Sequence, residues 1–243
     1  MREVRGGTNL TYGLVETLGQ SIVSGEYGPD RKFPTESELS QIYGASHSIT
    51  REAVKMLTAK GLVTARPRQG TSVEPESNWN LFDPDVLRWH LDRKFSLELL
   101  LNFTEIRLAI EPTAARLAAL KADAAAIAAM QRGIDRMKAA QTGEEDGLAA
   151  DIAFHTAVMN ATSNPFYAQM SGIVGVALRI SIRFTNALAG HAPDLGAHEA
   201  VLDAIRSGKP DKAAACMTDI VVGVMKLIHR AMADRGAKAS SAP

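Results

Sequence analysis

The sequence predicts a mainly α-helical protein of two domains: a small N-terminal domain of three helices and a β-hairpin, and a C-terminal all-α antiparallel bundle of six or seven helices. Residues 1–74 contain short periodic segments separated by Gly and Pro, whereas residues 83–233 are rich in Ala and Leu at helical spacing. Residues 75–82 interrupt both patterns and are the expected linker. A length of 243 residues suffices for two domains. Residues 234–243 are expected to form a flexible tail.

The first two helices are predicted by their periodicity and capping residues. The first covers residues 11–24 and ends before Gly25. Its apolar residues share one helical face: Leu14, Val15, Leu18, Ile22 and Val23. Thr35 and Glu38 have the spacing of a capping box, which predicts a second helix over residues 36–43.

A third helix and a hairpin are predicted to complete the N-terminal domain. Gly44 ends the second helix, and Ser46 or Ser48 is a suitable N-cap for the third. Residues 62–65 and 71–73 favour strands on either side of a turn. The expected order is therefore that of a winged helix-turn-helix.

The second half is predicted to be helical throughout. Asp83 and Pro84 form an N-cap and first-position pair, and a long helix over residues 96–120 contains Pro112, which is expected to kink it. Further helices are expected over residues 123–139, 148–160, 165–184, 193–206 and 210–232. Short connections between such helices favour an antiparallel bundle.

Composition limits the classes of function. Lys and Arg number 27 and Asp and Glu also 27, so a DNA-binding surface would have to be local. The single cysteine excludes an internal disulfide and is typical of a reducing compartment. No stretch approaches the roughly 18 to 20 apolar residues that cross a bilayer, and the N-terminus lacks the apolar core of a signal peptide. We therefore expect a soluble, cytoplasmic protein with no membrane partner.

The N-terminal domain has the features of a DNA-binding domain. The second helix of a helix-turn-helix enters the major groove, and the residues at its N-terminus reach the base edges. Here those residues are Ser46, His47, Ser48, Thr50 and Arg51. From residue 44 to 70 there are five basic residues and one acidic residue, and such a patch favours phosphates. The alternative is a small domain whose basic residues are a solvated face.

Four segments of this domain together resemble the GntR superfamily of bacterial regulators. They are Phe33–Ser40, Arg51–Leu57, Gly61–Val63 and Arg68–Val73. The resemblance implies that a double-stranded DNA operator contacts Ser46, His47, Ser48 and Arg51. It also implies that Gly70, at the tip of the wing, approaches the minor groove or the backbone. His47 stands where the family usually has Arg, and Ser37 replaces another frequent Arg, so two charges are missing.

Three residues of the second half have the spacing of a metal site. Asp151 and His155 are four apart and share a helical face, and His198 lies on a different helix. Carboxylate and imidazole groups placed in this way can hold a divalent metal inside a bundle. The alternative is a surface pair.

The same residues, with Asn164-Pro165 and Leu202–Ile205, resemble the FCD effector domain of the FadR branch. That resemblance implies one divalent metal, zinc or similar, held by one Asp and three His, and a carboxylate effector that the metal helps to bind. Ile220 stands near the position of the last His. The chain would therefore supply three ligands at most.

Four residues are candidates for the effector pocket. Arg107 occupies the place of an FCD arginine that faces the pocket, and its alternative role is an ion pair with Glu111. Arg179 and Arg183, four apart on an otherwise apolar helix, are expected to be buried and would then need an anionic partner. A salt bridge at a dimer or domain interface is the alternative for both. Asn186 can add a hydrogen bond.

The segment Asn78–Trp89 resembles D-galactonate-responsive regulators within this branch. Taken together, the sequence predicts a homodimeric transcriptional regulator, a repressor that reads an inverted repeat and responds to a small carboxylate such as D-galactonate. It is not expected to be an enzyme. The rival hypotheses are an architectural DNA binder without an effector and a metallohydrolase with a DNA-binding appendage, for which Glu199 would be the candidate base.

Overall fold

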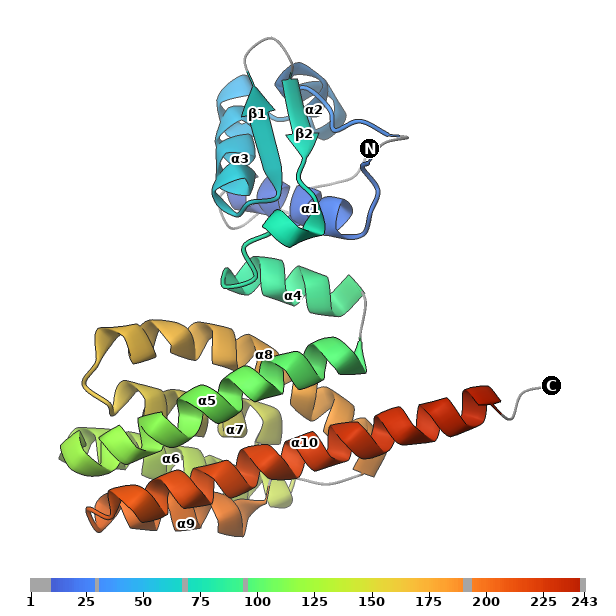
Figure 1. The fold of residues 1–243 in the computed structure, drawn as a ribbon. Helices are drawn as coiled ribbons and strands as arrows, with labels where there is room; N and C mark the ends of the chain where they lie inside the picture. The colour runs from blue at the N-terminus through green and yellow to red at the C-terminus, as the bar shows by residue number, and fades with distance from the viewer. Residues whose placement is uncertain (1–9, 29–30, 67–69, 94–95, 190–193, 241–243) are drawn as a thin grey trace. The chain divides into compact units, whose positions relative to one another are not determined.

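The computed structural model describes residues 10–28, 31–66, 70–93, 96–189 and 194–240. The chain forms two compact units, residues 1–94 and 95–243. The described residues are mostly helical, with one short antiparallel sheet (Figure 1). The predicted mainly α fold class is confirmed.

The N-terminal unit begins with the three predicted helices, α1 (Leu10–Val23), α2 (Glu36–Tyr43) and α3 (His47–Ala59). The capping box of α2 is present: Glu38 N–H donates to Thr35 Oγ1, and Thr35 N–H donates to Glu38 Oε2 at 2.8 Å. Gly44, with φ of 62°, ends α2 in the left-handed region, which a glycine adopts without steric cost. These local signals make the turn between α2 and α3.

The wing is a two-stranded antiparallel hairpin of β1 (Val63–Arg66) and β2 (Gly70–Val73), in which Val63 pairs with Val73 and Arg66 with Gly70. One apolar core joins the hairpin to the three helices. Its buried members include Leu14, Leu18, Leu39, Leu57 and Leu62. The N-terminal unit is therefore a complete winged helix-turn-helix.

The helix α4 (Pro84–Arg93) packs on α1 within the N-terminal unit. The sequence placed this helix at the start of the C-terminal bundle, so the boundary between the units lies later in the chain than expected. The physical reason is a close fit: the indole of Trp89 is buried directly against Gly19 of α1. Six helices are then left in the described part of the second unit.

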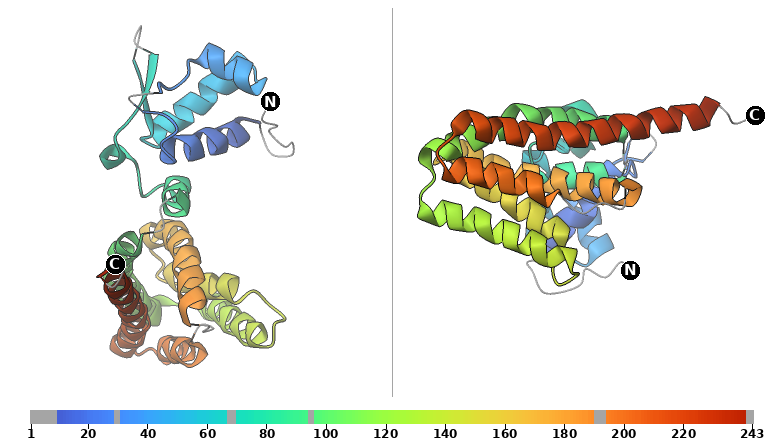
Figure 2. Two further views of the ribbon diagram at one scale, coloured as in Figure 1. Left: turned by 90° about the vertical axis from the view of Figure 1, so that its right-hand side faces the viewer. Right: turned by 90° about the horizontal axis from the view of Figure 1, so that it is seen from below.

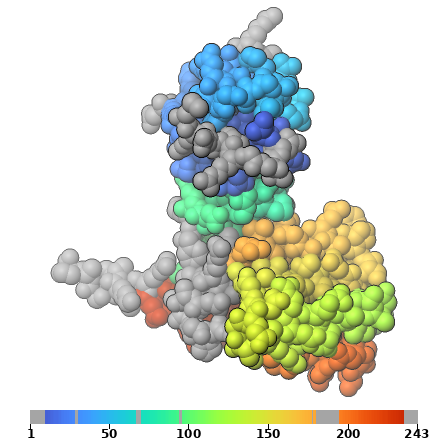
Figure 3. Space-filling model, turned by 180° about the vertical axis from the view of Figure 1, so that it is seen from behind, coloured from blue at the N-terminus to red at the C-terminus, as the bar shows by residue number. Residues whose placement is uncertain are grey.

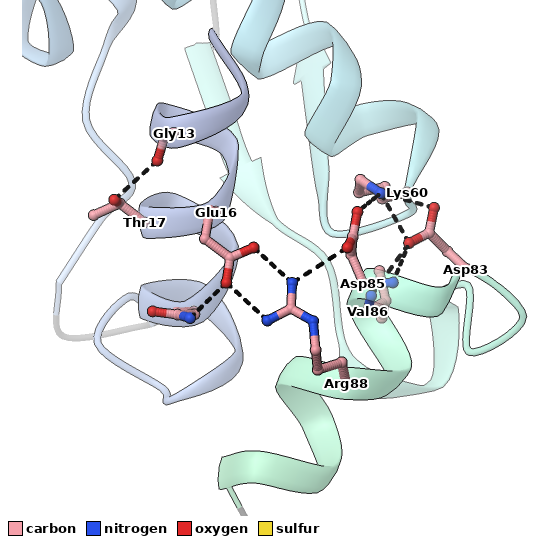
Figure 4. A network of polar contacts seen from close by, with 9 residues as sticks. Gly13, Glu16, Thr17, Lys60, Asp83, Asp85, Val86 and Arg88 are labelled. Carbon is pink, nitrogen blue, oxygen red and sulfur yellow. Dashed lines mark hydrogen bonds and ion pairs between the residues drawn. The ribbon is translucent and has the colours of Figure 1, made fainter. Parts of the chain in front are cut away.

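Ion pairs hold α4 in place (Figure 4). The Arg88 guanidinium donates to both carboxylate oxygens of Glu16 on α1, at 2.8 and 2.6 Å. Lys60, at the end of α3, donates to Asp83 at 2.8 Å and to Asp85 at 2.9 Å. The network ties α1 and the C-terminal end of α3 to α4 and the residue before it.

Gly19→Ala is expected to destabilise the N-terminal unit. A Cβ atom at residue 19 would overlap the ring of Trp89, which is too buried to swing away. Such overpacking costs about 1–3 kcal/mol, whereas an alanine in an open helical position gains roughly 0.5–1 kcal/mol. Both tryptophans of the chain, Trp79 and Trp89, lie in this unit, so urea unfolding followed by tryptophan fluorescence reports on it selectively.

The matched control is Gly223→Ala in the C-terminal unit, where a Cβ would meet nothing within 4 Å. That change should leave the fluorescence transition in place and slightly stabilise its own helix. Equal, small stabilisation by both alanines would contradict the packing of α4 on α1.

The ion-pair network also predicts acid sensitivity of the N-terminal unit. The hydrogen bond from Arg88 lowers the pKa of Glu16, and Lys60 and Arg88 outweigh burial to lower that of Asp85. A carboxyl whose pKa is lowered by folding stabilises the protein above its unfolded value of about 4 and loses that contribution as pH falls below it. Because both groups are partly exposed, the loss should be about 0.2–1 kcal/mol.

The measurement is the urea midpoint of tryptophan fluorescence from pH 6 to pH 3. A Glu16→Gln/Asp85→Asn variant should be less stable at pH 6 and depend less on pH. An acid slope that matches that of the unchanged protein would show that the two carboxylates do not carry the effect.

The C-terminal unit is an antiparallel bundle whose elements agree with the sequence prediction in order and approximate bounds. Its described helices are α5 (Leu97–Lys121), α6 (Ala124–Gln141), α7 (Gly147–Asn160), α8 (Pro165–Ala189), α9 (Leu195–Arg206) and α10 (Pro210–Ser240). Pro112 lies inside α5, which continues past it as one helix. The helix α10 continues past residue 233, where the bundle was expected to end, because Ala, Lys and Arg in this stretch favour a helix.

Packing inside the bundle is organised around α7. The helix α7 lies between α6 and α8 and contacts α5, while α9 packs on α10, α6 and α5. Both views of Figure 2 show α10 running alongside α5. The space-filling view shows α6 and α7, coloured yellow-green to yellow, covering one face of this unit (Figure 3). In the described residues, no helix has the length and apolar character needed to cross a membrane.

Candidate functional site

The N-terminal turn of α3 is shaped by Ser46. Its side chain accepts a hydrogen bond from Ile49 N–H at 3.4 Å and lies 2.9 Å from the hydroxyl of Ser48. Ser46 is therefore the N-cap, one of the two residues that the sequence left open. The cap fixes where α3 begins and which side chains its first turn presents.

Four of the predicted DNA contacts are exposed on the first turns of α3: Ser46, His47, Ser48 and Arg51. Gly70 is exposed at the start of β2. Thr50 is different, because it is fully buried and its hydroxyl donates to the carbonyl of His47 at 3.1 Å. Its inclusion among the residues that reach base edges was wrong.

The basic patch around α3 is weaker than the sequence count indicated. Lys60 is only 12% exposed because Asp83 and Asp85 hold its ammonium group. Both acidic residues lie more than twenty positions further along the chain, so local charge counting missed them. Arg51 makes only an exposed contact with Glu36, 3.4 Å from Nε to Oε2, and remains accessible. Arg68 lies outside the described residues.

A buried polar cluster lies inside the C-terminal bundle, where a packed apolar core would be expected. It comprises Arg107 and Glu111 of α5, Asp151 and His155 of α7, and His198 of α9. All five side chains are buried. The predicted trio converges: Asp151 Oδ1 lies 3.2 Å from His155 Nε2 and 3.1 Å from His198 Nε2. The two Nε2 atoms are 3.4 Å apart.

The donor set of this cluster fits a divalent metal ion. His198 Nδ1 lies 2.7 Å from the backbone carbonyl of Asp194, and His155 Nδ1 lies 2.6 Å from Glu111 Oε2. The first contact is a hydrogen bond, whereas the second is a close ion-pair contact without hydrogen-bond alignment. Both Nε2 atoms face Asp151 and can serve as ligands. One carboxylate and two imidazoles are a usual protein contribution to an open zinc-type site.

The electrostatics of the cluster are strongly coupled. Burial alone would raise the pKa of Asp151, but its hydrogen bonds with His155 and His198 outweigh burial and lower it. Glu111 and Asp151 likewise overcome burial and raise the pKa of His155 to about 9. The two carboxylates on either side of His155 thus favour its protonated form, and a metal would take the place of its Nε2 proton.

Arg107 is buried beside this trio, and one part of its guanidinium has no partner. Its Nε donates to Glu111 Oε1 at 2.5 Å, so the ion pair considered from the sequence exists but is internal and not on the surface. Among the described residues nothing accepts from Arg107 Nη1, which is buried. A buried donor of this kind usually has an acceptor, and an anionic ligand would supply one.

The remaining candidates differ from expectation. Arg179 is exposed, so the expectation that it is buried on an apolar helix was wrong, because that face of α8 is open in the single chain. The side chains of Arg183 and Asn186 lie outside the described residues. Ile220 packs against the apolar core of the bundle.

Two glutamates, Glu111 and Glu199, have roles that differ from those expected from the sequence. Glu111 contacts both Arg107 and His155, although the sequence offered it only as a partner of Arg107. Its position four residues before a buried Ala115 is typical of core-facing residues in α5 and was the available signal. Glu199 pairs with Lys138 at 2.7 Å on the surface, which removes the candidate base of the hydrolase hypothesis.

Family models match both units of the chain. The model for bacterial regulatory proteins of the gntR family matches residues 10–73, and the FCD domain model matches residues 102–222. The first covers the winged helix-turn-helix, and the second covers all five residues of the buried cluster.

Relatives with known names agree with these matches. The chain is 33% identical to the galactonate operon transcriptional repressor of Escherichia coli K12, over 90% of this chain and 97% of the relative. It is 35% identical to the uncharacterized HTH-type transcriptional regulator YieP of the same organism, over 84% and 89%. The solved structure of Escherichia coli McbR/YncC matches the fold with a TM-score of 0.52 at 16% identity, over 93% of this chain and all of that one.

The named relatives are transcription regulators and not enzymes, and the family matches extend over both units. The chain belongs to the GntR family of bacterial transcription regulators and carries an FCD domain.

Proposed function

We propose that this regulator is a homodimeric repressor whose operator binding is controlled by a small carboxylate of the sugar-acid class, such as D-galactonate, bound next to a divalent metal in the C-terminal bundle. The buried cluster carries this proposal. Arg107 Nη1 is a buried donor with no described partner, and it lies in the same cluster as three convergent metal-ligand groups. A carboxylate satisfies both an arginine and a metal.

The charges of the cluster favour an anion once a metal is bound. Arg107 and Glu111 cancel each other, and Asp151 offsets half of the charge of a divalent ion. One positive charge then remains in a buried site, where a single carboxylate would neutralise it. The hydroxyl groups of a sugar acid would complete the ion's shell or bind nearby polar groups.

On the DNA side, two winged units would read the two halves of an inverted repeat. Ser46, His47, Ser48 and Arg51 would contact the major groove, and Gly70 the minor groove or backbone. Effector binding shifts the DNA-binding equilibrium only by its differential affinity for the two arrangements of the dimer. A coupling of about 1–3 kcal/mol would weaken operator binding roughly 5- to 150-fold.

The sugar-acid class is supported by the similarity to the galactonate operon repressor. At this identity the effector of a relative indicates a class of compound and not a particular one. Arg179, Arg183 and Asn186 on α8 remain proposed as further contacts to the effector or to the second subunit.

The test is a thermal-shift screen of the full-length protein against aldonates, keto acids and short hydroxy acids, with and without a chelator. We expect D-galactonate or a related aldonate to raise the melting temperature, because a ligand of the native state stabilises it. Chelation should abolish the shift. A shift that survives chelation would remove the metal from the proposal, and no shift with any acid would favour the architectural DNA binder.

A further inference from the structure

Glu111 joins two parts of the buried cluster that the sequence treated separately. Its Oε2 atom lies 2.6 Å from His155 Nδ1 on α7, and its Oε1 atom accepts from Arg107 Nε at 2.5 Å on its own helix. The side chain is about 1% exposed. Arg107 Nη2 also donates to Oε2, at 3.4 Å, so the carboxylate bridges the two functional residues.

We propose that Glu111 is a positioning residue that fixes His155 as an Nε2 metal ligand and connects that ligand to the effector-facing guanidinium of Arg107. The inference rests on the metal part of the proposed function. An imidazole can bind a metal through either ring nitrogen, and the group that holds the other nitrogen decides which one is used. A carboxylate behind a ligating histidine also makes that ligand more basic.

The two histidines of the cluster differ in how they are held. His198 is anchored by the backbone carbonyl of Asp194, at the N-terminus of its own helix α9. His155 is anchored by a side chain of another helix, α5. The orientation of His155 therefore depends on a residue that can be substituted, and on the packing of α5 against α7.

A structural ion pair alone would not require this arrangement. A buried carboxylate needs partners, but Arg107 already neutralises Glu111. The Oε2 atom of Glu111 also faces His155 Nδ1, the ring nitrogen opposite the one that points to the predicted metal position. A purely structural role and a positioning role differ in one measurable property, the affinity for metal.

The experiment uses a background in which the buried residue 111 does not face an arginine. Removing Glu111 alone would leave Arg107 uncompensated and could unfold the protein, at about 3–5 kcal/mol. In Arg107→Met, Glu111 keeps His155 as its partner. Glu111→Leu added to this variant gives an apolar pair of similar volume, which is often neutral for stability. Glu111→Gln in the same background keeps an acceptor for His155 and is the conservative rescue.

The probe is zinc, titrated into the three metal-free full-length variants in competition with a chromophoric chelator. We expect Glu111→Leu to lower zinc affinity roughly 10- to 100-fold relative to Arg107→Met alone, the usual cost of losing such a partner. Glu111→Gln should recover part of that loss. Equal zinc affinity in all three folded variants would overturn the inference.

A second readout identifies the histidine that is affected. In the zinc-loaded protein, proton NMR should show two protected imidazole Nδ1 protons, one from His155 and one from His198. The His155 signal should disappear in the Glu111→Leu variant and persist with Gln, while the His198 signal is the internal control. Retention of both signals without Glu111 would contradict the positioning role.

These measurements involve neither effector nor DNA, so they separate the two proposals. If the unchanged protein binds no zinc, the metal part of the proposed function fails and this inference fails with it. If zinc binds and Glu111 has no influence, only this inference fails. An absent response to sugar acids, by contrast, would leave the zinc result standing.

Discussion

Arg51→Ala is expected to weaken operator binding by roughly 30- to 10⁴-fold. A bidentate contact between an arginine and a base is worth about 1–3 kcal/mol, and a dimer makes the contact in both half-sites. Arg51 is available for it, because the side chain is 64% exposed and its contact with Glu36 is long and solvated. The folded unit loses little with this side chain, since exposed pairs of this kind contribute about 0–1 kcal/mol.

The measurement is fluorescence anisotropy on an operator selected from random duplex DNA. Arg31→Ala is the matched control, because Arg31 is also an arginine of the N-terminal unit, is 63% exposed and pairs with the single acid Glu26. It should change operator affinity only slightly. An equal loss in both variants would mean that Arg51 adds general positive charge and does not read a base.

The parts of the fold that sequence reasoning predicted well are those set by local chemistry. The capping box of Thr35 and Glu38 fixed the start of α2, and Gly44 fixed its end. The same holds for the metal-ligand trio: four residues make one helical turn, so Asp151 and His155 had to share a face. His198 was included for its residue type on a separate helix, and the resemblance to FCD domains strengthened that choice, because no local pattern links residues 43 positions apart.

What the sequence did not predict depends on contacts between distant segments. Nothing near Lys60 reveals that Asp83 and Asp85 take its charge away from the DNA-facing side. Likewise, α4 has the composition of a bundle helix, and long-range contacts such as the fit of Trp89 against Gly19 and the ion pairs of Arg88 and Asp85 assign it to the N-terminal unit. Long-range packing of this kind decides where a domain ends, and periodicity carries no information about it.

Glu111 shows the same limit inside the site. The spacing of Arg107 and Glu111 is equally compatible with a surface ion pair and with a buried one. The pair is buried because both residues lie on the face of α5 that packs against α7 and α9. Once the pair is buried, its polar atoms need partners inside the protein. Oε2 of Glu111 contacts His155, whereas Nη1 of Arg107 has no acceptor among the described residues and is left for a ligand.

Arg107→Met is expected to abolish the response to effector while leaving operator binding nearly unchanged. Loss of a buried charge-assisted contact to a carboxylate costs about 2–5 kcal/mol, so D-galactonate should bind roughly 30- to 5000-fold more weakly. Methionine keeps the length and apolar stem of the arginine, and Glu111 keeps His155 at 2.6 Å. Removing one partner of a buried ion pair lowers stability, by about 3–5 kcal/mol, and the remaining contact with His155 limits that loss. The thermal unfolding curve checks that the variant is folded under the assay conditions.

Operator release by D-galactonate, followed by anisotropy, measures the response. Arg116→Met is the control, because it makes the same change on the same helix at a side chain that is 47% exposed and pairs with Asp211. It should respond to effector as the unchanged protein does. The decisive comparison is between the effects of the two substitutions. The Arg51 variant should lose DNA binding but still bind effector, and the Arg107 variant should bind DNA but no longer release it. Loss of both activities in either folded variant would mean that DNA and effector are not read by separate residues.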